Sequence, residues 1–236
     1  MSGRLYLVPN LLGVVPPAEV LPARTIAITQ RLRHFVVENA KPARQFLRAL
    51  GTVTPLQQLD IAEIGERPSP QRCVDLLSPA RDGNDLGMLS DAGCPGIADP
   101  GALLVAAAHR ENIVVVPLVG PSAVLLALMA SGMNGQGFTF HGYLPVKAEP
   151  RLTAIRKLEA ASQQSGDAQL FIETPYRNPA LIDALVAACK PGTRLCVATD
   201  LTTATESVES REMRDWRGRD VAGYAKRPAM YVLQAR

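Results

Sequence analysis

Short apolar runs alternate along this chain with longer segments whose apolar residues recur at helical spacing. The runs predict strands at residues 4–8, 34–38, 56–59, 86–89, 113–116, 138–143, 170–173, 195–199 and 230–234. The longer segments predict helices at residues 18–32 (interrupted near Pro22), 42–50, 70–78, 102–110, 123–130, 152–164 and 179–189. Strands that alternate with helices predict parallel pairing in a layered α/β fold.

The segment Pro117–Pro121 interrupts this alternation with two prolines and a glycine, after which the pattern resumes. We therefore expect two α/β domains, residues 1–118 and 119–236. The 236 residues are enough for two real cores, and 47% hydrophobic with 20% charged residues is ordinary for a globular protein.

The net charge and the cysteines limit which partners, metal sites and cellular compartment we expect. The formal net charge of +3 is compatible with an RNA substrate but does not argue for one by itself. The four cysteines form no CxxC pair and have no histidine at ligand spacing, so we expect free thiols, no metal site and a cytoplasmic protein. The N-terminus lacks a signal-peptide apolar region, and Pro117, Gly120 and Pro121 break the most apolar stretch, so no membrane partner is expected.

The loop Leu89–Gly101 carries the strongest functional signal. Two carboxylates, three glycines and two prolines follow a buried strand and precede an Ala-rich helix. Ligands bind at the carboxyl ends of strands in open α/β sheets. Glycine allows close approach to the backbone and proline fixes the loop beforehand, so this loop predicts a small-molecule site.

Three further segments place polar groups after strands: Val116–Ala123, Phe171–Arg177 and Ala198–Glu206. Ser122 can be either a helix N-cap or a pocket residue, and the other two segments can be polar helix caps. There is no P-loop and no GxSxG elbow, and the glycines near residue 135 precede a strand, which excludes a dinucleotide fingerprint.

In order along the chain, these segments resemble class III S-adenosylmethionine-dependent methyltransferases, the tetrapyrrole methylase superfamily. The resemblance rests on residues 5–9, 90–101, 115–123, 141–145 and 173–177, and more weakly on 200–206. It is strongest to the branch that 2′-O-methylates a cytidine ribose in small-subunit ribosomal RNA. The loop at 90–101 and the Gly120–Ala123 turn are specific, whereas the other matches are supportive.

This resemblance implies two α/β domains with S-adenosylmethionine in the cleft between them, in a protein that is usually a homodimer. Carried over by position, the implied donor-binding residues are Pro9, Ser90, Asp91, Ala92, Gly93, Cys94, Ile97, Ser122, Ala123, Thr174, Leu201, Pro228 and Ala229. The donor combines cationic groups, a carboxylate and an apolar adenine, which backbone carbonyls, a carboxylate and apolar side chains suit.

Methyl transfer is an in-line displacement, so most of its catalysis can come from positioning, about 7–11 kcal/mol in well-oriented systems. The chain therefore need not carry a catalytic triad. A hydroxyl acceptor would gain from a general base, for which Glu38, Glu173 and Asp200 are the candidates.

The acceptor side departs from the ribosomal branch. Where that branch has Glu-Asp-Thr-Arg-His, this chain has Glu38–Pro42. Where the branch has Arg-Glu-Leu-Thr-Lys, this chain has Thr199–Thr203, with two cations lost.

The first-choice acceptor is an RNA ribose 2′-hydroxyl, as in ribosomal RNA processing. A paralogous methyltransferase that acts on another acceptor is the alternative. A tetrapyrrole or other small molecule would suit a deep apolar cleft beside Phe138, Phe140 and Tyr143, and a donor-binding sensor without turnover is the third reading. Cations that could rim a wide RNA cleft are Lys41, Arg44, Lys147, Arg151 and Arg156.

Overall fold

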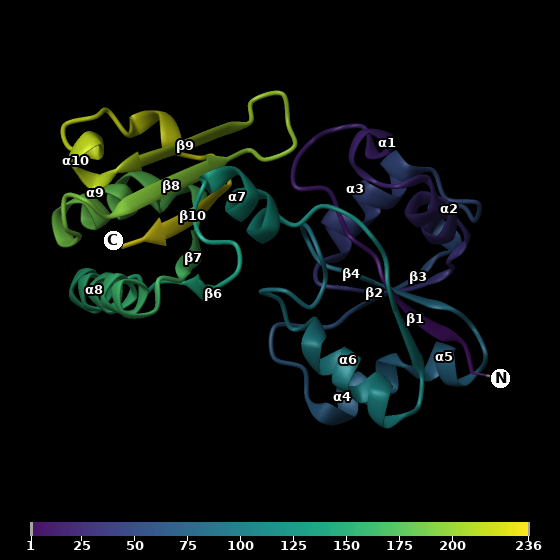
Figure 1. Cartoon of the computed structure of the whole chain (residues 1–236). Coiled ribbons are helices and arrows are strands. Elements are labelled where there is room, and N and C mark those ends of the chain that lie inside the picture. The colour runs from purple at the N-terminus through teal and green to yellow at the C-terminus, as the bar shows by residue number, and fades with distance from the viewer. Residues whose placement is uncertain (1, 236) are drawn as a thin grey trace. The chain divides into compact units, whose positions relative to one another are not determined.

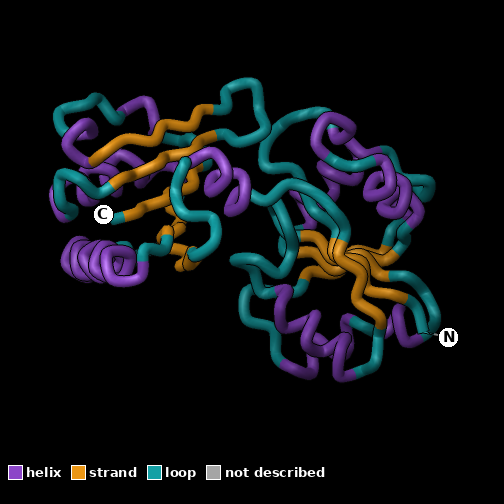
Figure 2. The backbone as a smooth tube through the Cα atoms, in the orientation of Figure 1, coloured by secondary structure: helices purple, strands orange, loops and turns teal. Residues whose placement is uncertain are grey.

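The computed structural model describes residues 2–235. The chain divides into two compact units (Figures 1 and 2), unit 1 ending at Ser122 and unit 2 beginning at Ala123. Each unit has its own sheet and its own apolar core.

Unit 1 is built on a parallel sheet with strand order β3-β2-β4-β1-β5. Its strands are β1 (Arg4–Leu7), β2 (His34–Val37), β3 (Asp60–Glu63), β4 (Leu86–Leu89) and β5 (Val114–Pro117). Because the strands are parallel, the loops after β1, β2, β4 and β5 leave from the same edge of the sheet. We call this set of loops the carboxyl edge.

Helices cover both faces of this sheet (Figure 2). One layer comprises α1 (Pro17–Val20), α2 (Ala23–Arg31) and α3 (Ala40–Leu50), and the other comprises α4 (Pro70–Leu76), α5 (Ser78–Arg81) and α6 (Gly101–Arg110). Successive strand residues alternate between the two cores: Phe35 and Val37 pack in the α2–α3 core, whereas Val36 packs in the α4–α6 core. Burial on both faces explains why the strands read as continuous apolar runs.

Unit 2 has a mixed sheet with strand order β6-β7-β10-β8-β9. Its strands are β6 (Phe138–Tyr143), β7 (Ala168–Glu173), β8 (Arg194–Thr199), β9 (Ser207–Glu212) and β10 (Ala229–Gln234), and its helices are α7 (Ala123–Ser131), α8 (Ala148–Ser165), α9 (Asn178–Ala188) and α10 (Met213–Trp216). Phe171 stacks on Tyr231 with ring centroids 5.4 Å apart, in a core shared with α8, α9 and α10. Helix α7 packs against β8, β9 and β10.

The structure corrects the predicted elements in three places. Residues 56–59 are not a strand: Leu56–Gln58 form a 3-10 turn after Pro55, and the strand follows at Asp60–Glu63, where a polar edge sequence hides it. β9 and α10 were not predicted, because Ser207–Glu212 is too polar to read as a strand. Parallel pairing is wrong for most of unit 2, since β10 inserts antiparallel between β7 and β8.

Cys73, Cys189 and Cys196 are free and buried, and Cys94 is free and partly buried. Among residues 2–235, no helix is both long enough and apolar enough to cross a bilayer.

Candidate functional site

The loops after β1, β4 and β5 contact one another at the carboxyl edge of unit 1. A Cβ on Gly120 would lie 2.3 Å from Pro9 Cβ, so only glycine allows the loop after β5 to approach the end of β1 this closely. Cys94 Sγ lies 3.5 Å from the Pro121 carbonyl oxygen. The turn before α7 and the loop after β4 are therefore held against each other.

Asn10 ties the loop after β1 to the loop after β4. Its buried side-chain amide donates to the carbonyl oxygens of Ser90 and Asp91, both at 3.0 Å, and its Oδ1 accepts from Leu11 N at 2.8 Å. Its backbone pairs with Gly93 in both directions, at 2.9 and 3.2 Å. Gly93 has a φ of +67°, a conformation glycine adopts without strain.

Asp99 shapes the second half of the loop. Its carboxylate accepts from Gly96 N with both oxygens, at 3.0 and 2.8 Å, and from Gly101 N at 2.7 Å. Burial raises the pKa of Asp99, an effect opposed by the amide donors of Gly101, Gly96 and Ile97. The side chain of Ile97, held by this turn, is 52% exposed.

Acidic side chains gather where β2 and β4 end. Glu38 Oε2 accepts from Asp91 N at 3.0 Å, and Asp91 Oδ2 accepts from Asn39 Nδ2 at 2.6 Å. Burial is the main cause that raises the pKa of Glu38; the amide of Asp91 lowers it, and the nearby Asp91 and Asp99 carboxylates raise it. No group of three or more His, Cys, Asp or Glu side chains within residues 2–235 could hold a metal ion.

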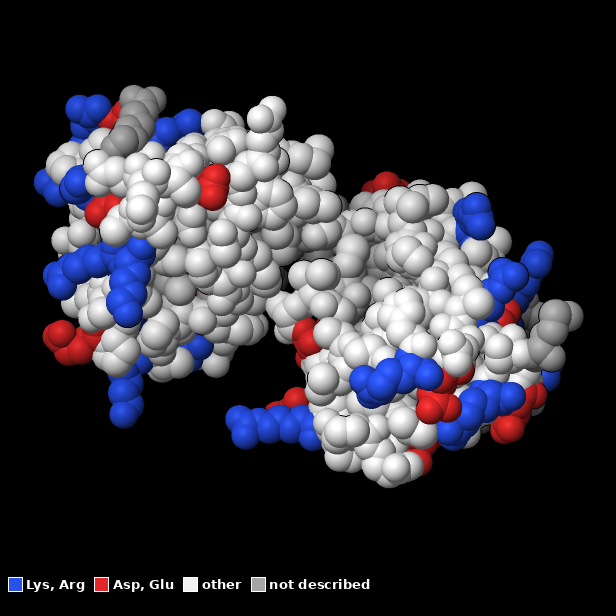
Figure 3. Space-filling model, turned by 60° about the horizontal axis from the view of Figure 1, so that its bottom comes forward, with Lys and Arg blue, Asp and Glu red and all other residues white. Residues whose placement is uncertain are grey.

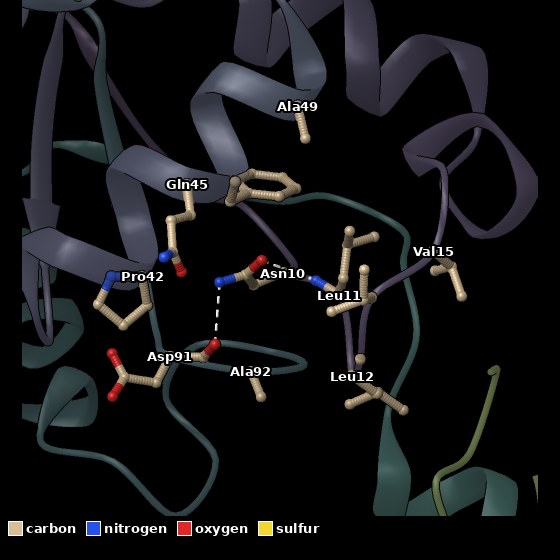
Figure 4. Close-up of a pocket in the computed structure, with 12 residues that line it drawn as sticks. Asn10, Leu11, Leu12, Val15, Pro42, Gln45, Ala49, Asp91 and Ala92 are labelled. Carbon is tan, nitrogen blue, oxygen red and sulfur yellow. Dashed lines mark hydrogen bonds between the residues drawn. The ribbon is translucent and has the colours of Figure 1, made fainter. Parts of the chain in front are cut away.

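A pocket of about 470 Å³ opens beside this network (Figure 4). Its walls come from the loop after β1, from α3 and from the start of the loop after β4, and we call it the α3 pocket. Figure 4 shows Gln45 and Pro42 of α3 on one side and Leu11, Leu12 and Val15 on the other. Its lining residues are Asn10, Leu11, Leu12, Gly13, Val14, Val15, Pro42, Gln45, Phe46, Ala49, Asp91 and Ala92.

In unit 2, three of the predicted segments meet at one edge of the sheet. Ala229 of β10 pairs with Glu173 on one side and with Thr199 on the other. Asp200 N donates to the Pro228 carbonyl oxygen at 3.0 Å, and Leu201 follows, buried. Thr174, Leu201, Pro228 and Ala229 therefore belong to one neighbourhood of unit 2.

The two carboxylates of this edge are engaged in ion pairs. The fully buried Glu173 side chain accepts from Arg177 Nη2 at 2.7 Å and from Thr174 N at 2.6 Å through the same oxygen. Asp200 Oδ2 accepts from Arg227 Nε at 2.6 Å. Both carboxylates thus anchor loops, whereas Glu38 has no cationic partner among the described residues.

The sequence model of the tetrapyrrole (corrin/porphyrin) methylase family matches residues 21–215 of this chain. The chain belongs to this family. It is an S-adenosylmethionine-dependent methyltransferase, as the resemblance in the sequence predicted.

Curated relatives of this methylase share about a third of its residues. It is 32% identical over 207 residues to a ribosomal RNA small subunit methyltransferase I of Neisseria meningitidis serogroup B, and 28% identical over 207 residues to the Escherichia coli O157:H7 protein of that name. These alignments cover 88% of the chain and 67% and 68% of the two relatives. The chain thus spans about two thirds of their length.

Solved structures share the methylase fold. The methyltransferase CobJ aligns over 99% of this chain and 95% of its own, with a TM-score of 0.65 at 18% identity. The cobalt precorrin-4 methyltransferase CbiF aligns over 98% of this chain and 94% of its own, with a TM-score of 0.63 at 13% identity. The predicted α/β class with two sheets is confirmed by these neighbours.

The carboxyl edge of unit 1 has groups that fit the methyl donor. An exposed carboxylate at Asp91 lies beside the backbone of Ala92 and Gly93, and exposed apolar surface is available at Ile97. In unit 2, Thr202 Oγ1 is buried and has no hydrogen-bond partner among residues 2–235.

Two groups of residues at this edge were missed in the sequence. Asn10 and Asn39 are not among the predicted site residues, although the position of Asn10 just after the first predicted strand is a usable signal. The walls of the α3 pocket were missed as well, because apolar residues in a loop carry no distinct pattern. A deep apolar cleft beside Phe138, Phe140 and Tyr143 would have favoured a small-molecule acceptor; on β6 Phe138 and Tyr143 are exposed, Phe140 is partly buried, and none of the three lines the α3 pocket.

Proposed function

We propose that this methylase transfers a methyl group from S-adenosylmethionine to a ribose 2′-hydroxyl of RNA, with small-subunit ribosomal RNA as the first substrate to test. The observation that carries the proposal is the similarity, across 88% of the chain, to relatives named ribosomal RNA small subunit methyltransferase I. The structure adds a pocket at the carboxyl edge whose α3 wall adjoins exposed cations.

The proposed donor-binding residues fall on both units. On unit 1 they are Pro9, Ser90, Asp91, Ala92, Gly93, Cys94, Ile97 and Ser122. On unit 2 they are Ala123, Thr174, Leu201, Pro228 and Ala229. Contacts within unit 1 support the first set, since Asn10, Gly93 and Gly120 bring its loops together. Strand pairing at Ala229 supports most of the second.

The donor supplies an electrophilic methyl group on a sulfonium sulfur. As the hydroxyl oxygen bonds to this carbon, the carbon–sulfur bond breaks and the hydroxyl proton must leave. Glu38 is our candidate to take that proton, because burial raises its pKa, which improves proton affinity, and no Lys or Arg among residues 2–235 pairs with it. Glu173 and Asp200, engaged by Arg177 and Arg227, serve to fix loops in this proposal.

The α3 pocket is the proposed acceptor pocket. Apolar residues of the loop after β1 and Phe46 offer surfaces on which a base or a ribose can pack. Gln45 and Asn10 supply amides in the same pocket. An acceptor there would lie next to Asp91, whose backbone amide donates to Glu38 Oε2; the Glu38 side chain itself does not line the pocket.

The test is transfer of labelled methyl from S-adenosylmethionine to small-subunit ribosomal RNA, free and in assembled subunits. A 2′-O-methyl group blocks alkaline cleavage at that nucleotide, so the label should appear in an alkali-resistant dinucleotide. Label in the base, or no label in RNA while the donor binds, would contradict the proposal.

A tetrapyrrole acceptor is the second candidate, and the apolar lining of the α3 pocket favours it. Methyl transfer to uroporphyrinogen-type compounds but not to RNA would select it. Donor binding without transfer to either acceptor would select a sensor.

We further propose that the methylase acts in the cytoplasm as a homodimer. Free cysteines suit a reducing compartment. Leu125 and Met129, four residues apart on the apolar helix α7, are 52% and 79% exposed, which a second copy could cover. Light scattering at micromolar concentration should give twice the chain mass, and a monomer mass would contradict the dimer.

A further inference from the structure

Helices α2 and α3 and the segment between them carry an unbalanced set of charges. Residues 21–50 hold six of the chain's 25 Lys and Arg residues and one of its 22 acids, Glu38. All six cations are exposed, and none forms an ion pair with another described residue. They are Arg24, Arg31, Arg33, Lys41, Arg44 and Arg48.

Three of these cations form a single row on α3, which we call the α3 stripe: Lys41, Arg44 and Arg48. Residues three and four apart in a helix lie on one face, so the three side chains project from the same side. At 1.5 Å per residue the row extends over about 10 Å. That length matches two to three phosphates along one strand of nucleic acid, at roughly 3.4 Å or more per phosphate.

The stripe works against the stability of its own helix. Lys41 lies in the first turn, where the helix dipole disfavours a cation, and that turn has no acid. Like charges three and four residues apart repel. A merely solvated helix face mixes both signs, as on the face of unit 1 in Figure 3, where Lys and Arg lie beside Asp and Glu. A partner with negative charge explains why three cations stand here without acids.

The stripe borders the α3 pocket directly. Gln45 lines the pocket, and it is four residues after Lys41 and three before Arg48, so it is their neighbour on the helix surface. Pro42 and Ala49 continue the same pocket wall (Figure 4). A polyanion along the stripe would pass beside the pocket mouth.

We propose that the α3 stripe binds the phosphate backbone of the RNA acceptor and holds it so that one nucleotide reaches the α3 pocket. This inference rests on the proposed function. Exposed Lys and Arg side chains on one helix face bind the phosphates of a nucleic acid whatever its base sequence. The stripe thus supplies affinity and register, while the pocket selects the nucleotide.

The test compares the unaltered protein with a variant carrying Lys41→Gln, Arg44→Gln and Arg48→Gln. Binding of a fluorescein-labelled single-stranded RNA and of small-subunit ribosomal RNA is followed by anisotropy over a KCl series. Each lost phosphate contact removes about 0.7 from the slope of log affinity against log salt. We expect a slope smaller by about 2 and RNA affinity lower by about 100-fold near 0.1 M salt.

Three controls separate this effect from others. Arg67→Gln, Arg110→Gln and Arg217→Gln together remove the same net charge from other exposed positions and should change affinity only slightly. Arg44→Lys with Arg48→Lys keeps the charge and should keep most of the RNA affinity. Affinity for S-adenosylmethionine, measured by calorimetry, should be unchanged in every variant, which also reports correct folding.

If both charge-removing triples weaken RNA binding equally, the stripe assignment is wrong while the proposed function stands. If the unaltered protein binds the donor but no RNA, the proposed function fails, and the stripe proposal with it. Restored binding in the charge-keeping variant, with loss confined to the α3 triple, supports the proposal.

Discussion

Replacing Asn10 with alanine should destabilise unit 1 through hydrogen bonds alone. The side chain makes three bonds, to the carbonyl oxygens of Ser90 and Asp91 and from Leu11 N, and it is 4% exposed. At about 1 kcal/mol net for each bond, the free energy of unfolding should fall by about 2–3 kcal/mol. With a urea slope of about 1–3 kcal/mol/M, the midpoint should fall by about 0.7–3 M.

The two units offer separate probes for this measurement. Trp216 is the chain's single tryptophan and lies buried in the core of unit 2, whereas far-ultraviolet circular dichroism follows both units. Asn10→Ala should shift a circular-dichroism transition and leave the Trp216 fluorescence transition in place. Asn39→Ala, which removes one bond of an exposed side chain, is the matched control and should cost less than about 1 kcal/mol. An unchanged midpoint for Asn10→Ala would show that these three hydrogen bonds do not stabilise unit 1.

Substitutions of three residues at the carboxyl edge of unit 1 have further expected outcomes. Asn10→Asp should replace the amide that donates to the Ser90 and Asp91 carbonyl oxygens with a carboxyl that faces them, so the new carboxyl would have a raised pKa. The loss of stability, measured by urea titration, should therefore be large at neutral pH and shrink as the pH falls through that pKa. Glu38→Gln should lower kcat about 10²- to 10⁴-fold with little change in donor affinity, and the acid limb of the unaltered enzyme's pH profile should lie above the usual glutamate pKa; an unchanged kcat would exclude Glu38 as the base. Gly120→Ala should cost about 1–3 kcal/mol and weaken donor binding in calorimetry, whereas Gly223→Ala, whose Cβ meets nothing within 4 Å, should do neither.

Much of the fold of unit 1 can be predicted from the sequence, because both faces of its sheet are buried. Apolar runs such as Leu86–Leu89 are bounded by polar or glycine-rich residues, and that strand appears with the expected bounds. The α/β alternation and the loop after β4 follow from the same signal. The topology of unit 2 does not follow, because strand direction there depends on where β10 inserts, and no local pattern records that choice.

The sequence predicts the site only where the backbone conformation requires glycine or proline. Glycines and prolines mark the loop after β4, and their number draws attention to it. Asn10 acts on backbone groups of Ser90 and Asp91 that only folding brings close, so its sequence neighbours say little about it, whereas Asp99 binds the amides of Gly96 and Gly101 within its own loop. The α3 pocket depends on the loop after β1 lying against α3, a tertiary contact that hydrophobic periodicity cannot reveal.

The most direct test of the central claim is the fate of labelled methyl from S-adenosylmethionine after incubation with small-subunit ribosomal RNA. We expect label in a single alkali-resistant dinucleotide, formed by the unaltered methylase and strongly reduced by Glu38→Gln. Label found only in a tetrapyrrole, or in an RNA base, would contradict methylation of an RNA ribose.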